Sequence, residues 1–186
     1  MSTKEKILDL AEFYIQHYGY NGFSYNDIST SLGVKNAAVH YHFPRKEELI
    51  QEVLRKARVQ FDLLAREAET LDKTHLEKVR RFLKIYDNNL TRDNRVCLIG
   101  ALATDLYTLP AGLGHHLNVL VVAMKSWLAE VLLQGKEQGE FDFDGTADQR
   151  AGVICSGMAG ALQMARILNN DEYYKIKSQL LNDIIK

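Results

Sequence analysis

Proline and cysteine are both scarce in this chain, with two residues of each among 186. Because proline interrupts helices, its scarcity favours an all-helical protein. Two cysteines, Cys97 and Cys155, are too few for the disulfide framework of a small secreted domain. We therefore expect a reducing environment and predict a cytoplasmic location.

Long uninterrupted apolar segments are also lacking. Residues 1–20 carry acidic side chains within an amphipathic pattern, unlike the short apolar stretch of a signal peptide. The most apolar run, residues 117–133, is interrupted by Lys125 and Glu130. That run predicts a buried helix rather than a membrane span, and a membrane is not among the partners we expect.

Neither sign of charge is in excess, since the formal net charge is -1. Residues 1–46 contain five Lys or Arg and four Asp or Glu. A surface that binds nucleic acid must therefore arise from the placement of basic residues and not from their number. This balance predicts modest affinity for one copy and favours binding as a dimer.

The motifs of several enzyme classes are missing as well. The chain has no His and Cys set with metal-ligand spacing, no phosphate-binding loop and no signature of a nucleophile with its base. We predict no catalytic residue, no metal and no other cofactor. A small helical enzyme is one alternative, with Asp105 and His115 or His116 as its acid–base group.

Apolar residues at helical spacing fill most of the chain, which is 46% hydrophobic, and no strand pattern interrupts them. The predicted fold class is all-α. Ser2 and Glu5 form a capping box for a first helix over residues 3–18, and Pro44 opens a long fourth helix. Further helices are predicted beyond Asp72 and over about 96–109, 113–139, 146–168 and 172–185.

Residues 24–49 hold the most informative pattern. Ser24 and Asp27 form a capping pattern for a short helix, which ends at Gly33. A second short helix follows, with Val39 and Phe43 on its inner side. Two short helices joined by a tight glycine turn form a helix-turn-helix, which lays its second helix in the major groove of DNA.

This segment resembles the DNA-binding domain of the TetR family of bacterial transcriptional repressors. The resemblance implies a three-helix DNA-binding bundle over residues 1–46 and a larger helical ligand-binding and dimerisation domain over residues 47–186. It implies three partners: an operator in double-stranded DNA, a small ligand and a second copy of the chain. The matching residues are Ser24, Ile28, Leu32-Gly33-Val34, His42-Phe43, Lys46-Glu47 and Leu49.

The resemblance also implies which residues meet DNA. By position, Ser24, Tyr25, His42 and Lys46 correspond to phosphate contacts. Four positions correspond to residues that face the bases: Asn26, Asn36, Ala38 and Tyr41. There an Asn side chain can bond adenine and an Ala methyl can contact thymine. An alternative for Tyr25 and Tyr41 is a plain surface role. The predicted DNA contacts are Ser24, Tyr25, Asn26, Lys35, Asn36, Ala37, Ala38, His40, Tyr41, His42 and Lys46.

Three positions depart from the common pattern of the family. Lys35 replaces the usual serine cap, so the second short helix begins after either Lys35 or Asn36. If Asn36 caps that helix, its side chain is occupied and reads bases less well. Ala37 replaces a frequent glycine, and His40 replaces a phosphate-binding tyrosine. A histidine at that place predicts phosphate binding that strengthens below neutral pH.

A stripe of small residues at four-residue spacing marks the helix predicted over residues 146–168. Small residues let helices approach closely, so the stripe fits either packing within one subunit or a helical interface between two copies. The family forms its dimer with its last two helices, and a two-fold dimer suits a palindromic operator. The predicted dimer interface is Gly152, Val153, Ser156, Gly160, Met164, Ile167, Leu180 and Ile184.

The resemblance places a ligand pocket inside the larger domain. Most candidate residues there are apolar, and each also fits a role as plain core. Such a cavity suits a small and largely apolar ligand. Cys97 has a second alternative as a redox sensor, because Arg92 and Arg95 are near in sequence. The candidates are Phe61, Tyr86, Cys97, Ala101, Thr104, Asp105, Tyr107, Asn118, Met124, Trp127 and Met158.

The function that these patterns predict is a homodimeric transcriptional regulator, released from a palindromic operator by its ligand. A change in the tilt of the fourth helix would separate the two DNA-reading helices. A corepressor-dependent regulator or an activator has the same sequence features. A helical protein that uses its helix-turn-helix to bind another protein is a further alternative.

Overall fold

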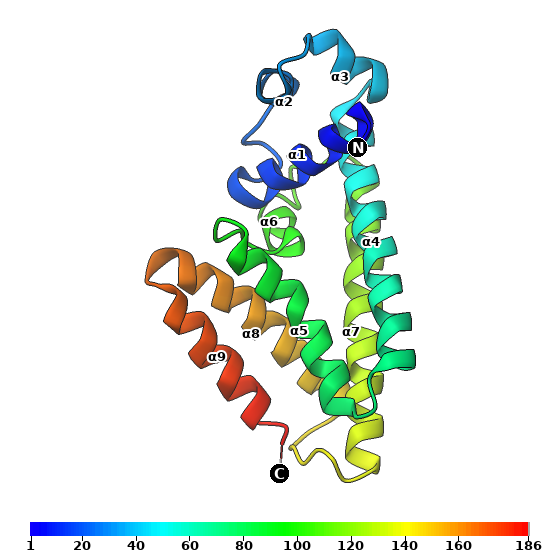
Figure 1. Ribbon diagram of the computed structural model, residues 1–186, viewed down its shortest axis with the longest axis vertical. Helices are drawn as coiled ribbons and strands as arrows, with labels where there is room; N and C mark the ends of the chain where they lie inside the picture. The colour runs from blue at the N-terminus through cyan, green and yellow to red at the C-terminus, as the bar shows by residue number, and fades with distance from the viewer. Residues whose placement is uncertain (186) are drawn as a thin grey trace. The chain divides into compact units, whose positions relative to one another are not determined.

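The computed structural model describes residues 1–185, and within them the chain is helical (Figure 1). Pairing of strand type is confined, over these residues, to one isolated bridge between Phe141 and Ile185. The predicted all-α fold is therefore confirmed. The helices are α1 (Thr3–Tyr18), α2 (Tyr25–Leu32), α3 (Asn36–His42), α4 (Lys46–Leu71), α5 (His75–Thr91), α6 (Leu98–Thr104), α7 (Leu113–Glu137), α8 (Ala147–Ile167) and α9 (Asn170–Asn182).

Reciprocal capping fixes where several helices begin. At the start of α1, Ser2 donates its N–H to the Glu5 carboxylate at 2.6 Å, and the Ser2 hydroxyl accepts the N–H of Glu5. The same arrangement joins Thr74 to Glu77 before α5 and Thr146 to Gln149 before α8. Each box satisfies N–H groups that the first helical turn leaves without a partner.

The helices pack into two compact units, and α4 and α7 contribute to both. The first unit contains residues 1–59 and 98–120, and the second contains residues 60–97 and those from 121 onward. Packing therefore does not divide the chain at residue 46. The functional boundary predicted there stays a prediction.

The core of the first unit joins α1 to the two short helices. Ile7, Ala11 and Ile15 of α1 are fully buried, as are Ile28 of α2 and Val39 of α3. Helix α1 also packs against α6. The core of the predicted DNA-binding bundle, residues 1–46 (the head), therefore continues into a segment that lies some eighty residues further along the chain.

The core of the second unit is built on α5, α8 and α9, with aromatic residues from α4 and α7. Phe82 stacks on Trp127 with ring centroids 6.1 Å apart, and Phe61 meets both rings edge-on. The carboxylate of Asp87 on α5 accepts hydrogen bonds from the Tyr173 hydroxyl and the Lys177 ammonium group of α9. These contacts fix α9 to the rest of the unit.

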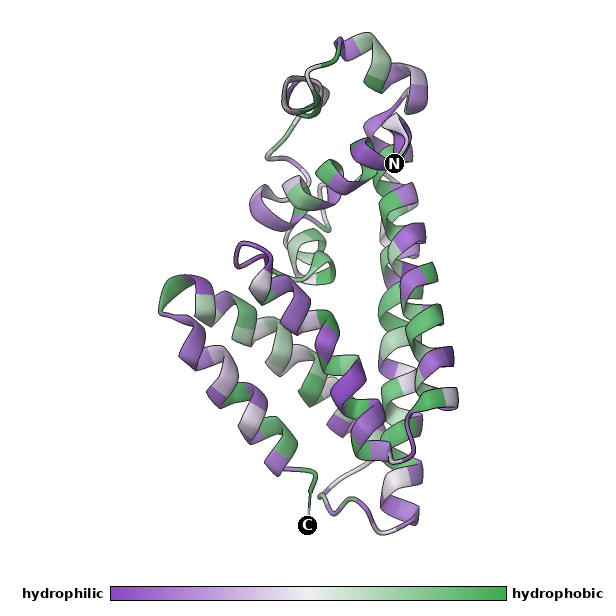
Figure 2. Ribbon diagram, in the orientation of Figure 1, coloured by the Kyte–Doolittle hydropathy of each residue, from purple (hydrophilic) through white to green (hydrophobic). Residues whose placement is uncertain are grey.

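Helix α7 is long and apolar enough, by length and composition alone, to cross a membrane. Apolar residues follow much of its length (Figure 2). However, Leu117, Leu120, Leu128 and Val131 are buried at spacings of three, eight and three residues, so they follow a helical face. Of its most apolar stretch, 33% is buried within the chain, so the prediction of a buried helix stays a prediction.

Three helix boundaries differ from those predicted. Helix α4 begins at Lys46, two residues after Pro44. Helix α9 begins at Asn170, where Asn169 accepts the N–H of Asp171. Helix α6 ends at Thr104 instead of near residue 109, because the N–H of Asp105 bonds to the carbonyl three residues earlier and the chain turns.

Candidate nucleic-acid interface

The turn between α2 and α3 depends on Gly33. This residue has φ 66° and ψ 31°, in the left-handed region that favours glycine. Its N–H bonds to the carbonyl of Thr30, and the N–H of Val34 bonds to that of Ser29. Helix α2 therefore ends within one residue, and the two short helices form the predicted helix-turn-helix.

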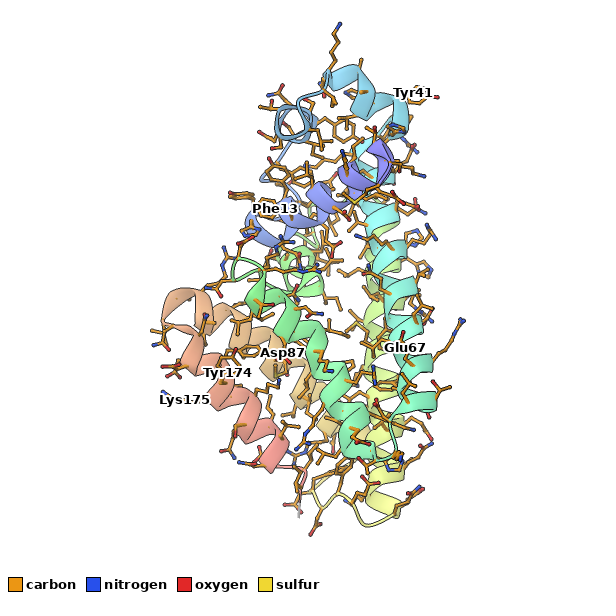
Figure 3. The ribbon with its side chains drawn as sticks, viewed as in Figure 1. Phe13, Tyr41, Glu67, Asp87, Tyr174 and Lys175 are labelled. Atoms are coloured by element: carbon orange, nitrogen blue, oxygen red, sulfur yellow. The ribbon has the colours of Figure 1, made fainter. Side chains whose placement is uncertain are left out.

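Helix α3 has one buried and one exposed side. Val39 and Phe43 are buried beneath it. Asn36, Ala37 and His40 are exposed, and Tyr41 is 83% exposed and projects from the outer side of the helix (Figure 3). The exposed side carries amide, methyl, imidazole and phenol groups, which are the kinds of group that read base edges and bind phosphates.

The position of Asn36 decides between the two helix starts left open by the sequence. Lys35 is the N-cap of α3 and makes no capping bond with its side chain, so Asn36 is the first residue of the helix. Its exposed amide is not used for capping. Asn36 is thus well suited to meet a base, although that contact stays a prediction.

The start of α2 presents a carboxylate beside Ser24. The hydroxyl and the N–H of Ser24 both donate to Asp27 at 2.7 Å. These bonds lower the pKa of Asp27, so it stays charged at neutral pH. Asn26 is exposed next to this pair, and Ser24, Ala38, His42 and Lys35 also keep at least part of their side chains accessible.

Tyr25 requires a correction. It is only 8% exposed, and its hydroxyl is buried without a hydrogen-bond partner. The ring lies edge-on to His40, with centroids 4.7 Å apart. Burial raises the pKa of Tyr25, with a smaller contribution from Glu48. The hydroxyl therefore does not lie at the surface where a phosphate would approach.

Lys46 requires a similar correction. Its ammonium group donates to the backbone carbonyls of Tyr20 and Phe23 and lies 3.9 Å from the centre of the Phe23 ring. Burial lowers the pKa of Lys46, and the carboxylates of Asp105 and Asp27 oppose that shift. The group predicted to bind a phosphate instead holds the turn between α1 and α2.

Several of the residues predicted to contact a ligand belong to the first unit and are not buried in its core. The carboxylate of Asp105 accepts the N–H of Tyr20 at 2.6 Å. Tyr107 is 99% exposed, Asn118 is exposed, and the Thr104 hydroxyl donates to the carbonyl of Ala101 within its own helix. Of this group in the first unit, only Ala101 is buried. Asp105 and Tyr107 lie outside the predicted pocket because α6 ends before them.

The other ligand candidates belong to the second unit. Sequence reasoning missed Cys155 as a member of this set: it forms a hydrogen bond with the buried hydroxyl of Tyr86. It also missed Phe82, whose ring packs against both Phe61 and Trp127. The helical spacing of Phe82 predicts that it is buried, but this spacing does not distinguish a plain core residue from one that lines a ligand site. Candidates that are buried or partly buried in this unit are Phe61, Tyr86, Cys97, Met124, Trp127 and Met158.

The predicted dimer residues fall into two groups. Val153, Met164 and Ile167 on α8 are exposed, and the space beside Gly160 is open. Ser156 is exposed, with its hydroxyl bonded to the carbonyl of Gly152. Leu180 and Ile184 are buried within the chain, so their assignment to the interface is wrong.

Two family models match the chain. The model described as bacterial regulatory proteins of the tetR family matches residues 7–53. The model described as the tetracyclin repressor-like C-terminal domain matches residues 75–180. Neither model describes an enzyme family.

Two curated relatives match about a quarter of the chain. The icaADBC biofilm-operon negative transcriptional regulator IcaR of Staphylococcus epidermidis is 39% identical over 49 residues, and that of Staphylococcus aureus strain Newman is 35% identical over 49 residues. In both cases the match covers 26% of this chain and 26% of the relative. The chain therefore matches about a quarter of the length of these relatives.

Solved structures match almost the whole chain. A TetR-family transcriptional regulator from Agrobacterium tumefaciens is 28% identical with a TM-score of 0.91, covering 98% of this chain and 97% of its own. A TetR transcriptional regulator from Legionella pneumophila is 28% identical with a TM-score of 0.88, covering 99% and 98%. With the helix-turn-helix in place and the C-terminal model matching more than half of the residues, the chain belongs to the TetR family of bacterial regulatory proteins.

Proposed function

We propose that this regulator is a repressor that binds a palindromic operator as a homodimer and leaves it when a small molecule binds. The observation that carries the proposal is the exposed side of α3. Asn36 is the first residue of this helix and its side chain is not used for capping, and Tyr41 projects from the same helix. The similar IcaR proteins are negative transcriptional regulators, which favours repression over activation.

The outer side of α8 supports the dimer. Val153, Met164 and Ile167 expose apolar side chains, while Gly160 leaves room for another helix to approach. Exposed apolar side chains on the outer side of one helix are typical of an interface. A two-fold interface would present two copies of α3 to two half-sites of a palindrome.

The second unit supports binding of a small, largely apolar molecule. Its aromatic residues Phe61, Phe82 and Trp127 pack against one another. The hydroxyl of Tyr86 and the thiol of Cys155 form a polar pair in the same unit. Apolar walls with few polar groups are typical of such sites. Action on a chromosomal operator accords with the predicted cytoplasmic location.

The direct test is footprinting of the purified protein on the DNA immediately upstream of its own gene, at moderate salt. We expect a protected palindrome. Asn36→Ala should weaken the protection roughly 5- to 150-fold, the range for one bidentate base contact. Asn88→Ala, the same change at an exposed position of α5, should leave it unchanged. Absence of protection by a folded dimer would contradict the proposal, and protection only with added metabolite would indicate a corepressor.

A further inference from the structure

The turn between α1 and α2, residues 19–24, is held by a carboxylate from the end of α6. The Asp105 side chain accepts the N–H of Tyr20 at 2.6 Å and the side-chain amide of Asn21 at 3.3 Å. The Asn21 amide also donates to the Thr108 hydroxyl at 2.9 Å. These contacts join positions more than eighty residues apart within the first unit.

A cation holds the same turn from the start of α4. Lys46 donates to the carbonyls of Tyr20 and Phe23. The N–H of Tyr20 is thus bound to a carboxylate and its C=O to an ammonium group. Hydrogen bonds with one charged partner are roughly twice as strong as neutral ones. Movement of either charged group therefore acts directly on the backbone of this turn.

Gly19 permits the close approach of the carboxylate. It has φ 77°, which side chains rarely adopt, and a Cβ there would stand 2.7 Å from an oxygen of Asp105. Both the conformation and the contact require glycine. The turn is thus shaped around this carboxylate.

The last residue of the turn, Ser24, is the N-cap of α2, the first helix of the helix-turn-helix. Phe23 is buried, and Ser24 follows it and binds Asp27 at the start of α2. Because Ser24 and Asn26 lie at this end, a shift of the turn changes where α2 meets the DNA backbone. The same shift alters the direction in which α3 enters the groove, since the short Gly33 turn joins the two helices.

We propose that Asp105 is a positioning residue that couples α6 to the DNA-binding head by holding the backbone of residues 19–21. This inference rests on the proposed function, because it concerns affinity for the operator. Helix α6 begins at Leu98, directly after Cys97, which ends the first segment of the second unit. A change in the second unit that shifts α6 then acts on the turn directly, in addition to any change in α4.

The first test is hydrogen exchange of the full-length protein without DNA, measured by mass spectrometry. Asp105→Ala should speed exchange in peptides covering residues 19–24 at least several-fold. Asp105→Asn, which keeps an acceptor oxygen for the Tyr20 N–H, should restore much of the protection. Asp144→Ala removes an exposed carboxylate from the second unit and should change nothing in these peptides.

The second test uses the same variants in the footprinting experiment. Asp105→Ala should lower operator affinity about tenfold although Asp105 is not a predicted DNA contact, and Asp105→Asn should restore most of it. Faster exchange with unchanged affinity would make the contact merely structural and would overturn the coupling. Unchanged exchange would overturn the hold on the turn itself. If the wild-type protein protects no DNA while exchange responds as expected, the proposed function fails but the hold stands.

A double variant gives an independent check. Gly19→Ala should affect the turn at least as strongly as Asp105→Ala, because the new methyl group displaces the carboxylate and the backbone at φ 77° is strained for alanine. If both act through one contact, the double variant should be little worse than Gly19→Ala alone, as expected for coupled neighbours. Additive effects on affinity would contradict the proposal.

Discussion

A methyl carbon of Leu180 on α9 lies 2.9 Å from the point where a Cβ on Gly157 of α8 would stand. Three residues along α8, Gly160 has no neighbouring atom within 4 Å of the same point. The small residues of α8 therefore serve two different purposes. Gly157 admits α9 of the same chain, and Gly160 leaves an open surface.

Alanine at these two glycines should have opposite effects. Gly157→Ala should destabilise the fold by about 1 kcal/mol, because the buried Leu180 has little room to move and overpacking outweighs the gain in helix propensity. Gly160→Ala should stabilise the single subunit by about 0.5–1 kcal/mol, the usual advantage of alanine over glycine in a helix. Both changes are made in the Ile167→Glu background, because in the proposed dimer a second helix would meet the new methyl group. Urea unfolding of both variants measures this difference, and equal effects would refute the assignment of two environments.

The exposed apolar residues of α8 give a prediction about assembly. Ile167 is 77% exposed. Ile167→Glu should convert the proposed dimer to a monomer in sedimentation experiments without unfolding the chain, because a charge buried at an apolar interface is unfavourable. Lys84→Glu, at an exposed position of α5, is the control and should leave the proposed dimer intact. A dimer that survives Ile167→Glu would move the interface elsewhere.

Much of the fold follows from the sequence, since capping pairs and apolar spacing predict most helices. The failures concern which side of a helix meets which neighbour. Leu180 and Ile184 are apolar and periodic, but periodicity alone does not tell whether α9 turns them toward α8 or toward a second copy. Asp105 and Lys46 meet the α1–α2 turn through contacts distant in sequence, which no local pattern reveals.

The buried hydroxyl of Tyr25 predicts a gain in stability on its removal. It has no hydrogen-bond partner, and an unsatisfied buried polar group is unfavourable. Tyr25→Phe should therefore stabilise the protein by about 1 kcal/mol. Tyr14→Phe is the matched control: its hydroxyl lies 2.8 Å from that of Ser31, so its loss should destabilise. Thermal unfolding distinguishes them, and weaker operator binding by Tyr25→Phe would show that the hydroxyl becomes accessible on DNA.

Cys155 predicts a loss of stability in alkali. Burial raises the pKa of its thiol to about 11, above the value near 8.5 of an unfolded cysteine. Between these values the unfolded chain releases a proton that the folded chain keeps, so stability is full below about pH 8.5 and falls as the pH rises toward 11. Urea unfolding at pH 8 and pH 10 under reducing conditions should show the fall. Cys155→Ala should make it shallower, and an identical fall would assign it to other groups, such as the buried Tyr86.

Substitutions of Lys35 and Lys46 should affect the salt dependence of operator binding differently. Lys35 is exposed before α3, whereas the ammonium group of Lys46 is bound to the carbonyls of Tyr20 and Phe23. Each phosphate neutralised by a lysine adds about 0.9 to the slope of log affinity against log salt. Lys35→Gln should therefore reduce that slope by about 0.9 for each subunit, or about 1.8 for the proposed dimer, with little effect on stability. Lys46→Gln should leave the slope unchanged but destabilise the head by about 1–3 kcal/mol, because two carbonyls lose a charged donor. A reduced slope for Lys46→Gln in a fully folded protein would show that the ammonium group leaves the turn to bind phosphate, and would restore the role that its position in the family implies.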